Sequence, residues 1–205
     1  MAPSPGNSIL IKMKYPNTVG KLAQITDAIA KAGGSISYVE VLESNRTHIV
    51  RDITIDTTGL EQAENIIESV KSIPEVEILE HYDCTFKIHE AGKLDVVSKR
   101  PLKNIIDLSM AYTPGVARVC TAISENPELA KCYTIKSNTV AVLSDGTAVL
   151  GLGNIGPLAA MPVMEGKAVL FKEFGGVNAF PICINAKSAD EIVDLAVAVA
   201  PSAAR

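Results

Sequence analysis

The order of strand-like and helix-like hydrophobic patterns in the first ninety residues restricts the fold more than any other feature of the chain. Apolar and polar side chains alternate over 9–15, which predicts a half-buried strand. Strand-like runs follow at 35–44 and 48–56, and a last extended run is expected over 76–89. Helical stripes of apolar residues lie after the first strand and after the third. The order strand, helix, strand, strand, helix, strand predicts a ferredoxin-like α+β sandwich.

The turn YPNTVGKL between the first strand and the first helix resembles the signature of ACT domains, small modules that often bind amino acids at paired interfaces. Asn17, Val19, Gly20 and Leu22 occupy the pattern Asp-x-Pro-Gly-x-Leu, in which the Gly and Leu match but the Asp and Pro do not. A glycine allows close backbone approach, and a helix start offers free amides to a carboxylate. The resemblance implies an amino-acid effector near Asn17, Val19, Gly20 and Gly33, and a homodimer. Alternatively, Gly20 simply makes a tight turn.

A polar segment with a proline separates this region from a second one. We expect a disordered start at 1–7, an ACT-like regulatory domain at 8–90, a linker at 91–100 and an incomplete α/β domain at 101–205. All three histidines precede the linker. Acid-base chemistry in the second region must therefore use Lys, Tyr, Asp, Glu or Cys.

The second region mixes helices and strands. A helical stretch is interrupted at 112–117, where Pro and Gly force a turn. Two β-rich arms around an Asp-Gly pair predict a hairpin over 139–151. A helix to about residue 171, a strand at 178–185 and a helix opened by the capping box 188–191 complete the pattern.

The run 151-GLGNIG-156 matches the glycine pattern of a dinucleotide-binding turn. Such a turn opens a parallel β-α-β unit and needs an acidic residue about 20 positions on, at the end of the next strand. Glu173 lies before the strand 178–185, and that strand ends on Asn185 and Lys187. Because the predicted hairpin also conflicts with a parallel unit, we expect no cofactor-binding residues here. The glycines are interpreted as a sharp turn into the following helix.

Three segments, 112–117, 144–181 and 188–193, resemble the malic enzymes of the bacterial type. The match covers nearly all of 95–201, and an ACT-like domain ahead of it is known in that family. Members oxidise malate with NAD or NADP and decarboxylate the resulting oxaloacetate to pyruvate with Mg²⁺ or Mn²⁺. The resemblance implies an amino-terminal fragment of such an enzyme, with malate and pyruvate as its partners and allosteric regulation through the ACT-like domain.

The resemblance assigns two catalytic residues. Tyr112 of YTPGVA would be the general acid that protonates the enol of pyruvate at C3, and Lys167 of MEGKA the general base for the C2 hydroxyl of malate. A lysine serves as base only where burial or a nearby cation favours its neutral form. The apolar neighbours of Lys167 would favour that form, whereas Glu165 would oppose it. Without the resemblance, Tyr112 reads as a half-buried aromatic residue and Lys167 as a snorkelling lysine.

Substrate recognition departs from the eukaryotic members, which carry an arginine where this chain has Ala148. Arg118, Ser137, Asn138 and Asn154 are the candidate substrate-binding residues. The metal ligands and the nucleotide domain of the family lie beyond the matched region. We therefore expect no metal and no NAD(P) on this fragment, which should be inactive alone.

Composition narrows the alternatives. Residues 1–90 hold 8 basic and 13 acidic side chains and residues 91–205 hold 11 and 10, net −5 and +1, which argues against nucleic acid as a partner. The start lacks a signal peptide and no run is long enough to span a membrane, so a cytoplasmic protein is expected. The alternative function is a non-enzymatic amino-acid sensor with a dimerisation or binding module. NAD versus NADP, the preferred metal, the effector, and whether Tyr112 serves its own or a neighbouring chain stay open.

Overall fold

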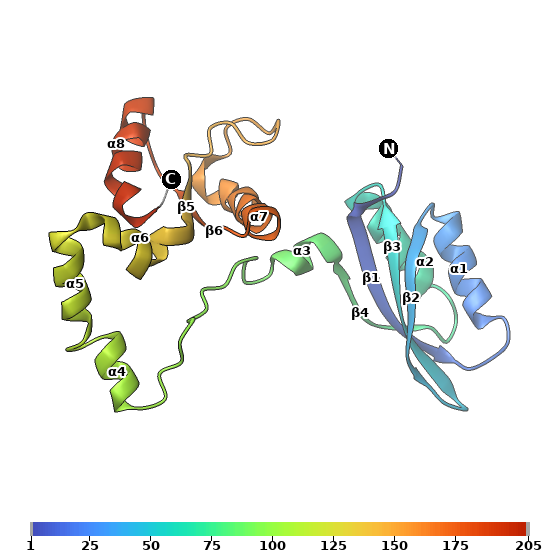
Figure 1. The fold of residues 1–205 in the computed structure, drawn as a ribbon. Coiled ribbons are helices and arrows are strands. Elements are labelled where there is room, and N and C mark those ends of the chain that lie inside the picture. The colour runs from blue at the N-terminus through green and yellow to red at the C-terminus, as the bar shows by residue number, and fades with distance from the viewer. Residues whose placement is uncertain (1, 204–205) are drawn as a thin grey trace. The chain divides into compact units, whose positions relative to one another are not determined.

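The chain divides into two compact units, one ending at Glu90 and the other beginning at Ala91. The computed structural model describes residues 2–203, and Figure 1 shows the elements of each unit. Each unit mixes helices with a sheet, as the sequence predicts. Within the described residues, no helix combines the length and apolar character that crossing a bilayer requires.

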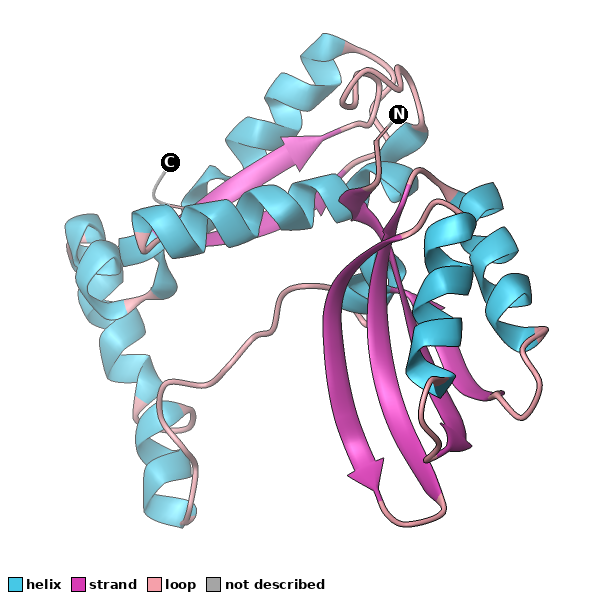
Figure 2. Cartoon of the chain, turned by 90° about the vertical axis from the view of Figure 1, so that its right-hand side faces the viewer, coloured by secondary structure: helices cyan, strands magenta, loops and turns pink. Residues whose placement is uncertain are grey.

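The first unit is a four-stranded antiparallel sheet with two long helices packed on one face (Figure 2). Its elements are β1 (Ser4–Pro16), α1 (Lys21–Lys31), β2 (Ser35–Ser44), β3 (His48–Thr57), α2 (Leu60–Lys71), β4 (Glu77–Asp83) and α3 (Cys84–His89). The strand order is β2-β3-β1-β4, with every neighbouring pair antiparallel. This topology confirms the ferredoxin-like sandwich.

The core of the first unit lies between the sheet and α1 and α2. Alternate residues of β1, from Ile9 to Tyr15, are buried together with Ile53 and Ile55 of β3 and the inner stripes of both helices. The period of two in the strand and the spacing of the helical stripes place these side chains on facing surfaces. Helix and strand periods read from the sequence thus meet in one core.

Two local predictions for this unit are wrong. Residues 4–7 belong to β1 instead of a disordered start, since Ser4 pairs with Thr57 across a register shift. The extended run over 76–89 ends at Asp83, and residues 84–89 form α3. The physical reason is the Asp83 carboxylate, which accepts hydrogen bonds from the backbone N–H groups of Thr85 and Phe86 at 2.8 and 3.0 Å and so starts a helix.

The second unit begins with helical segments and continues as a β-α-β unit. Its elements are α4 (Ile105–Ala111), α5 (Val116–Glu125), η1 (Pro127–Leu129), α6 (Ala130–Tyr133), η2 (Ile135–Asn138), β5 (Thr139–Ser144), α7 (Gly156–Gly175), β6 (Asn178–Cys183), α8 (Ala189–Val199) and η3 (Ala200–Ser202). β5 pairs with β6 in parallel, and α7 crosses between them. The stripe Ala160, Met164 and Ala168 is the buried side of α7.

The predicted hairpin over 139–151 is wrong. Only β5 forms, because the residues after it bond within their own loop instead of pairing with the strand. The N–H groups of Ile155 and Gly156 both donate to the Gly146 carbonyl, at 3.0 and 3.2 Å, and Val149 donates to Gly153 at 3.1 Å. The glycines at 151–156 therefore do lie within a parallel β-α-β unit.

Candidate functional site

The loop between β5 and α7 fixes the start of the helix that carries Lys167. Gly146 has φ of +74°, and a Cβ there would lie 2.1 Å from the carbonyl oxygen of Gly156. Only glycine permits this approach of backbone to backbone. Asn154 Oδ1 accepts a hydrogen bond from the Gly156 N–H at 3.2 Å, at the first residue of α7. The loop is thus closed on itself where α7 begins.

Asp145 opens this loop and is held by Thr147. Its Oδ1 accepts the backbone N–H of Thr147 at 3.1 Å and the Thr147 hydroxyl at 2.8 Å. These two hydrogen bonds, the backbone one first, lower the pKa of Asp145 from its ordinary value. Asp145 is therefore a fixed anion at the end of β5.

Lys167 lies on the outer part of α7. Its side chain is exposed, whereas Met164 and Ala168 turn inward to the sheet. The apolar sequence neighbours of Lys167 do not cover its side chain, because the helix directs those neighbours to other sides. The ammonium group is accessible to a substrate.

Tyr112 ends α4. Its N–H donates to the Leu108 carbonyl and its own carbonyl accepts from Val116 N–H, each at 2.9 Å, while its side chain is 66% exposed. Figures 1 and 2 both show α4 standing away from α7. The backbone of Tyr112 is therefore held in place while its side chain faces solvent.

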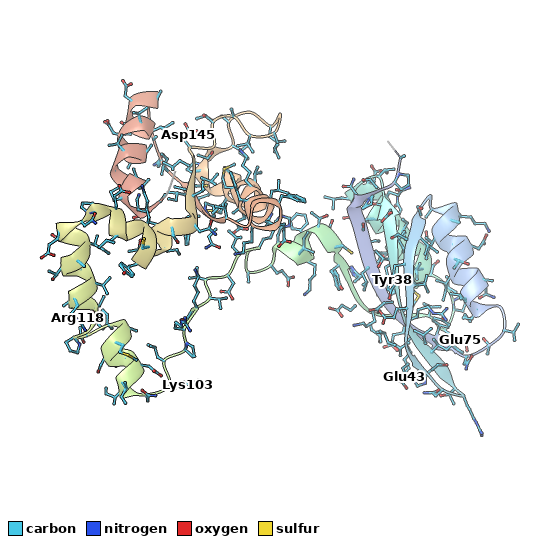
Figure 3. All side chains as sticks on the ribbon, in the orientation of Figure 1. Tyr38, Glu43, Glu75, Lys103, Arg118 and Asp145 are labelled. Atoms are coloured by element: carbon cyan, nitrogen blue, oxygen red, sulfur yellow. The ribbon has the colours of Figure 1, made fainter. Side chains whose placement is uncertain are left out.

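The four candidate substrate-binding residues are dispersed. Asn138 donates to the Gly176 carbonyl at 2.7 Å, just past the end of α7, whereas Asn154 lies at its start. The 20 residues of α7 separate the two by about 30 Å. Ser137 is exposed on η2, and Figure 3 shows Arg118 on α5, apart from Asp145. One chain does not assemble a carboxylate-binding cluster from these four.

The proposed regulatory residues lie at two ends of α1. Gly20, with φ of +89° and open space on its Cβ side, caps the start of the helix, and Val19 beside it is exposed. Asn17 is engaged within the fold, because its side-chain amide donates to the Asn45 carbonyl at 2.7 Å. Gly33 lies beyond the other end, about 16 Å along the 11-residue helix, where a Cβ would meet Gln62 Nε2 at 2.5 Å. A small ligand at Gly20 does not reach Gly33.

The described residues do not fit a metal ion or a dinucleotide. No group of three or more His, Cys, Asp or Glu side chains within residues 2–203 is placed to hold a metal. Although 151–155 precede α7 in a parallel unit, β5 ends at Ser144, seven residues before Gly151, and no acidic residue ends β6. The dinucleotide pattern therefore lacks two of its structural conditions.

One contact in this unit has no signal in the sequence pattern. Lys93, placed by the sequence in a polar linker, hydrogen-bonds to Glu165 and Pro162 of α7. A partner 69 to 72 residues away leaves no local period in the sequence, and the positive φ values beside Lys93, +60° at Ala91 and +84° at Gly92, are seen only in the structure.

Comparison with known proteins shows which family and which relatives this chain is similar to. The family described as malic enzyme, N-terminal domain, matches residues 91–195. An NAD-dependent malic enzyme of Geobacillus stearothermophilus is 53% identical over 195 residues, 95% of this chain and 41% of that protein. An NADP-dependent malic enzyme of Haemophilus influenzae is 50% identical over 111 residues, 54% of this chain and 15% of that protein. A crystal structure of malic enzyme from Pyrococcus horikoshii has a TM-score of 0.54 at 53% identity, covering 55% of this chain and 26% of that one. Two curated relatives match this chain over almost its whole length, and the chain spans about two fifths of the length of each of them.

Proposed function

The chain belongs to the malic enzyme family, and on this premise we propose that the full-length protein oxidises malate with NAD or NADP and decarboxylates the product to pyruvate and carbon dioxide. The match to residues 91–195 carries the proposal, because it contains both Tyr112 and Lys167. Relatives named as NAD-dependent and as NADP-dependent support a nicotinamide cofactor without choosing between the two. The activity is proposed for the full-length enzyme, not for this chain alone.

Lys167 is the proposed general base. When the C2 hydride of malate leaves, the C2 hydroxyl must lose its proton, and a neutral amine within hydrogen-bond reach accepts it. The exposed position of Lys167 on α7 supports this role, since the ammonium group is open to a substrate. Its neutral form would require that substrate and further protein groups exclude water around it.

Tyr112 is the proposed general acid. After the C3–C4 bond breaks and carbon dioxide leaves, the enol of pyruvate gains a proton at C3, and a phenol can donate it. The backbone of Tyr112 is fixed by two hydrogen bonds while its side chain is exposed, which supports a group that reaches outward.

Mg²⁺ or Mn²⁺ and the nucleotide are proposed for the full-length enzyme only. The described residues fit neither group, so no step through them is assigned to this chain. Arg118, Ser137, Asn138 and Asn154 stay candidates for substrate contacts, although no cluster of them supports a specific one.

We further propose that the first unit is an ACT-like regulatory domain that binds an amino acid and pairs with a second copy. The antiparallel order β2-β3-β1-β4 and the open left-handed Gly20 at the start of α1 support it. Calorimetric titration of the full-length protein with the common amino acids tests it. Heat that disappears in Val19→Glu, in which an added carboxylate at this exposed position repels that of the ligand, would support a site at Gly20; no heat with any amino acid would remove the effector.

The enzymatic proposal is tested by the formation of reduced nicotinamide from malate in the full-length protein. Lys167→Ala and Tyr112→Phe should each abolish pyruvate formation. Lys187→Ala and Tyr133→Phe are matched controls, since both residues are exposed and have no assigned role, and they should keep full activity. Near-normal turnover in Lys167→Ala or Tyr112→Phe would refute the residue roles. If the wild type forms no reduced nicotinamide from malate but does bind an amino acid, the sensor function would be favoured instead.

A further inference from the structure

The first residues of the second unit are fastened to α7. Lys93 donates its backbone N–H to Glu165 Oε2 at 3.3 Å and its Nζ to the Pro162 carbonyl oxygen at 2.7 Å. The backbone at Gly92 has φ of +84°, and a Cβ there would lie 3.0 Å from Glu165 Oε1. Lys93 is also the one residue from 90 to 106 that is not exposed. The attachment is therefore local and specific within an otherwise solvated segment.

The attachment point lies on the turn of α7 that leads to Lys167. Pro162 and Glu165 precede Lys167 by five and two residues on the same continuous helix. A helix transmits a shift at one turn to the next because its backbone bonds link residues four apart. A hydrogen bond from an ammonium group is among the stronger ones available to a surface segment. Segment 91–93 is therefore hydrogen-bonded to the helix that carries Lys167.

We propose that Lys93 and Glu165 are positioning residues that hold α7, and with it Lys167, in the orientation that proton transfer from malate requires. This inference rests on the proposed role of Lys167 as base. In this role Lys93 and Glu165 act through the helix and need not touch substrate or cofactor. Since a displacement of about 1 Å at a catalytic group can reduce a rate about 100-fold, even a modest loosening of α7 should appear in turnover.

The test uses the full-length protein with paired variants. Lys93→Met removes the donor and keeps the apolar stem, whereas Lys93→Arg keeps a cationic donor. Glu165→Leu removes the acceptor, and Glu165→Gln keeps one. Lys99→Met is the control, since Lys99 lies in the same segment and is exposed. For each variant, kcat and KM for malate and the hydrogen exchange of the peptide around residues 162–171 are measured.

We expect Lys93→Met and Glu165→Leu to lower kcat about tenfold with KM within about twofold, as loss of orientation predicts. Lys93→Arg, Glu165→Gln and Lys99→Met should stay close to the wild type. Hydrogen exchange in α7 should rise in Lys93→Met and in Glu165→Leu but not in Lys99→Met. If either deleting variant misfolds, the other carries the comparison.

Three outcomes would overturn this proposal, and the first two distinguish its failure from failure of the proposed function. If Lys93→Met and Glu165→Leu both keep the kcat and the hydrogen exchange of the wild type while Lys167→Ala is inactive, the positioning role is overturned and the catalytic assignment stays in place. Full activity of Lys167→Ala would remove the catalytic assignment and, with it, the positioning role. Faster exchange in α7 without loss of kcat would also overturn the positioning role, because the attachment would then be structural only.

Discussion

Replacing Gly146 with alanine should destabilise the second unit far more than the same change at Gly151. Both glycines lie in the β5–α7 loop with nearly equal φ values of +74° and +77°, so the two variants share the left-handed backbone penalty of about 1–2 kcal/mol. They differ in surroundings. A Cβ at Gly151 meets nothing within 4 Å, whereas at Gly146 it would lie 2.1 Å from the Gly156 carbonyl oxygen.

That oxygen belongs to the backbone and cannot move aside by changing a rotamer. The start of α7 must shift instead, and overpacking of this kind costs about 1–3 kcal/mol more. We expect losses of about 2–5 kcal/mol for Gly146→Ala and about 1–2 kcal/mol for Gly151→Ala in the free energy of unfolding.

Urea unfolding followed by far-ultraviolet circular dichroism measures both, since residues 1–205 contain no tryptophan for fluorescence. Equal losses in the two variants, within about 0.5 kcal/mol, would show that the close approach of Gly146 to Gly156 is absent and would refute the reasoning. In the full-length enzyme, Gly146→Ala should also lower malate turnover, because α7 begins at this contact.

Three further changes test other contacts. A methyl group at Gly34 would lie 2.7 Å from Cγ2 of the fully buried Ile55, so Gly34→Ala should cost about 1–3 kcal/mol by thermal unfolding; an unchanged melting temperature would contradict that packing. Asp83→Ala removes the two cap hydrogen bonds of α3 and should cost about 1 kcal/mol in urea, with Asp83→Asn nearly neutral; equal losses in both would argue against the cap. Thr147→Val removes one of the donors that lower the pKa of Asp145, so by NMR titration that pKa should rise, whereas Thr147→Ser should leave it unchanged. Because the folded-state pKa of Asp145 is depressed, the wild type should be more stable than Thr147→Val above about pH 4. This difference in stability should vanish as the pH falls through the folded-state pKa; a difference that persists in acid would point to another cause.

The hydrophobic patterns of the sequence predicted the first unit well, because apolar residues recur at the spacing of the strand or helix that carries them. β2 coincides with the run 35–44, and β3 extends the run 48–56 by one residue. In β3 every second residue from Ile53 to Thr57 is buried, whereas β2 is exposed almost throughout. The failure at 84–89 has a local cause. An apolar run is compatible with strand or helix, and the Asp83 side chain decides between them.

In the second unit, the residue types of a turn were not enough to predict a hairpin. Asp145-Gly146 does form a turn, but Val149 is buried within the loop and its amide bonds to Gly153, so no second arm pairs with β5. A parallel partner lies 39 residues away in sequence, at Asn178 opposite Thr139, and no local pattern reveals it. The roles of Tyr112 and Lys167 came from the resemblance and stay predictions.

The parallel pair β5 and β6 has a consequence for the colloidal behaviour of this chain. Within the described residues each strand has one edge with no neighbour, and a cavity of about 390 Å³, lined mostly by apolar residues, lies against both strands. Parallel sheets normally have both faces covered, and open edges are templates for further strands. Solutions of residues 1–205 should therefore form larger species as concentration rises. Light scattering would detect this growth, and lysines introduced along the outer edge of β6 should suppress it.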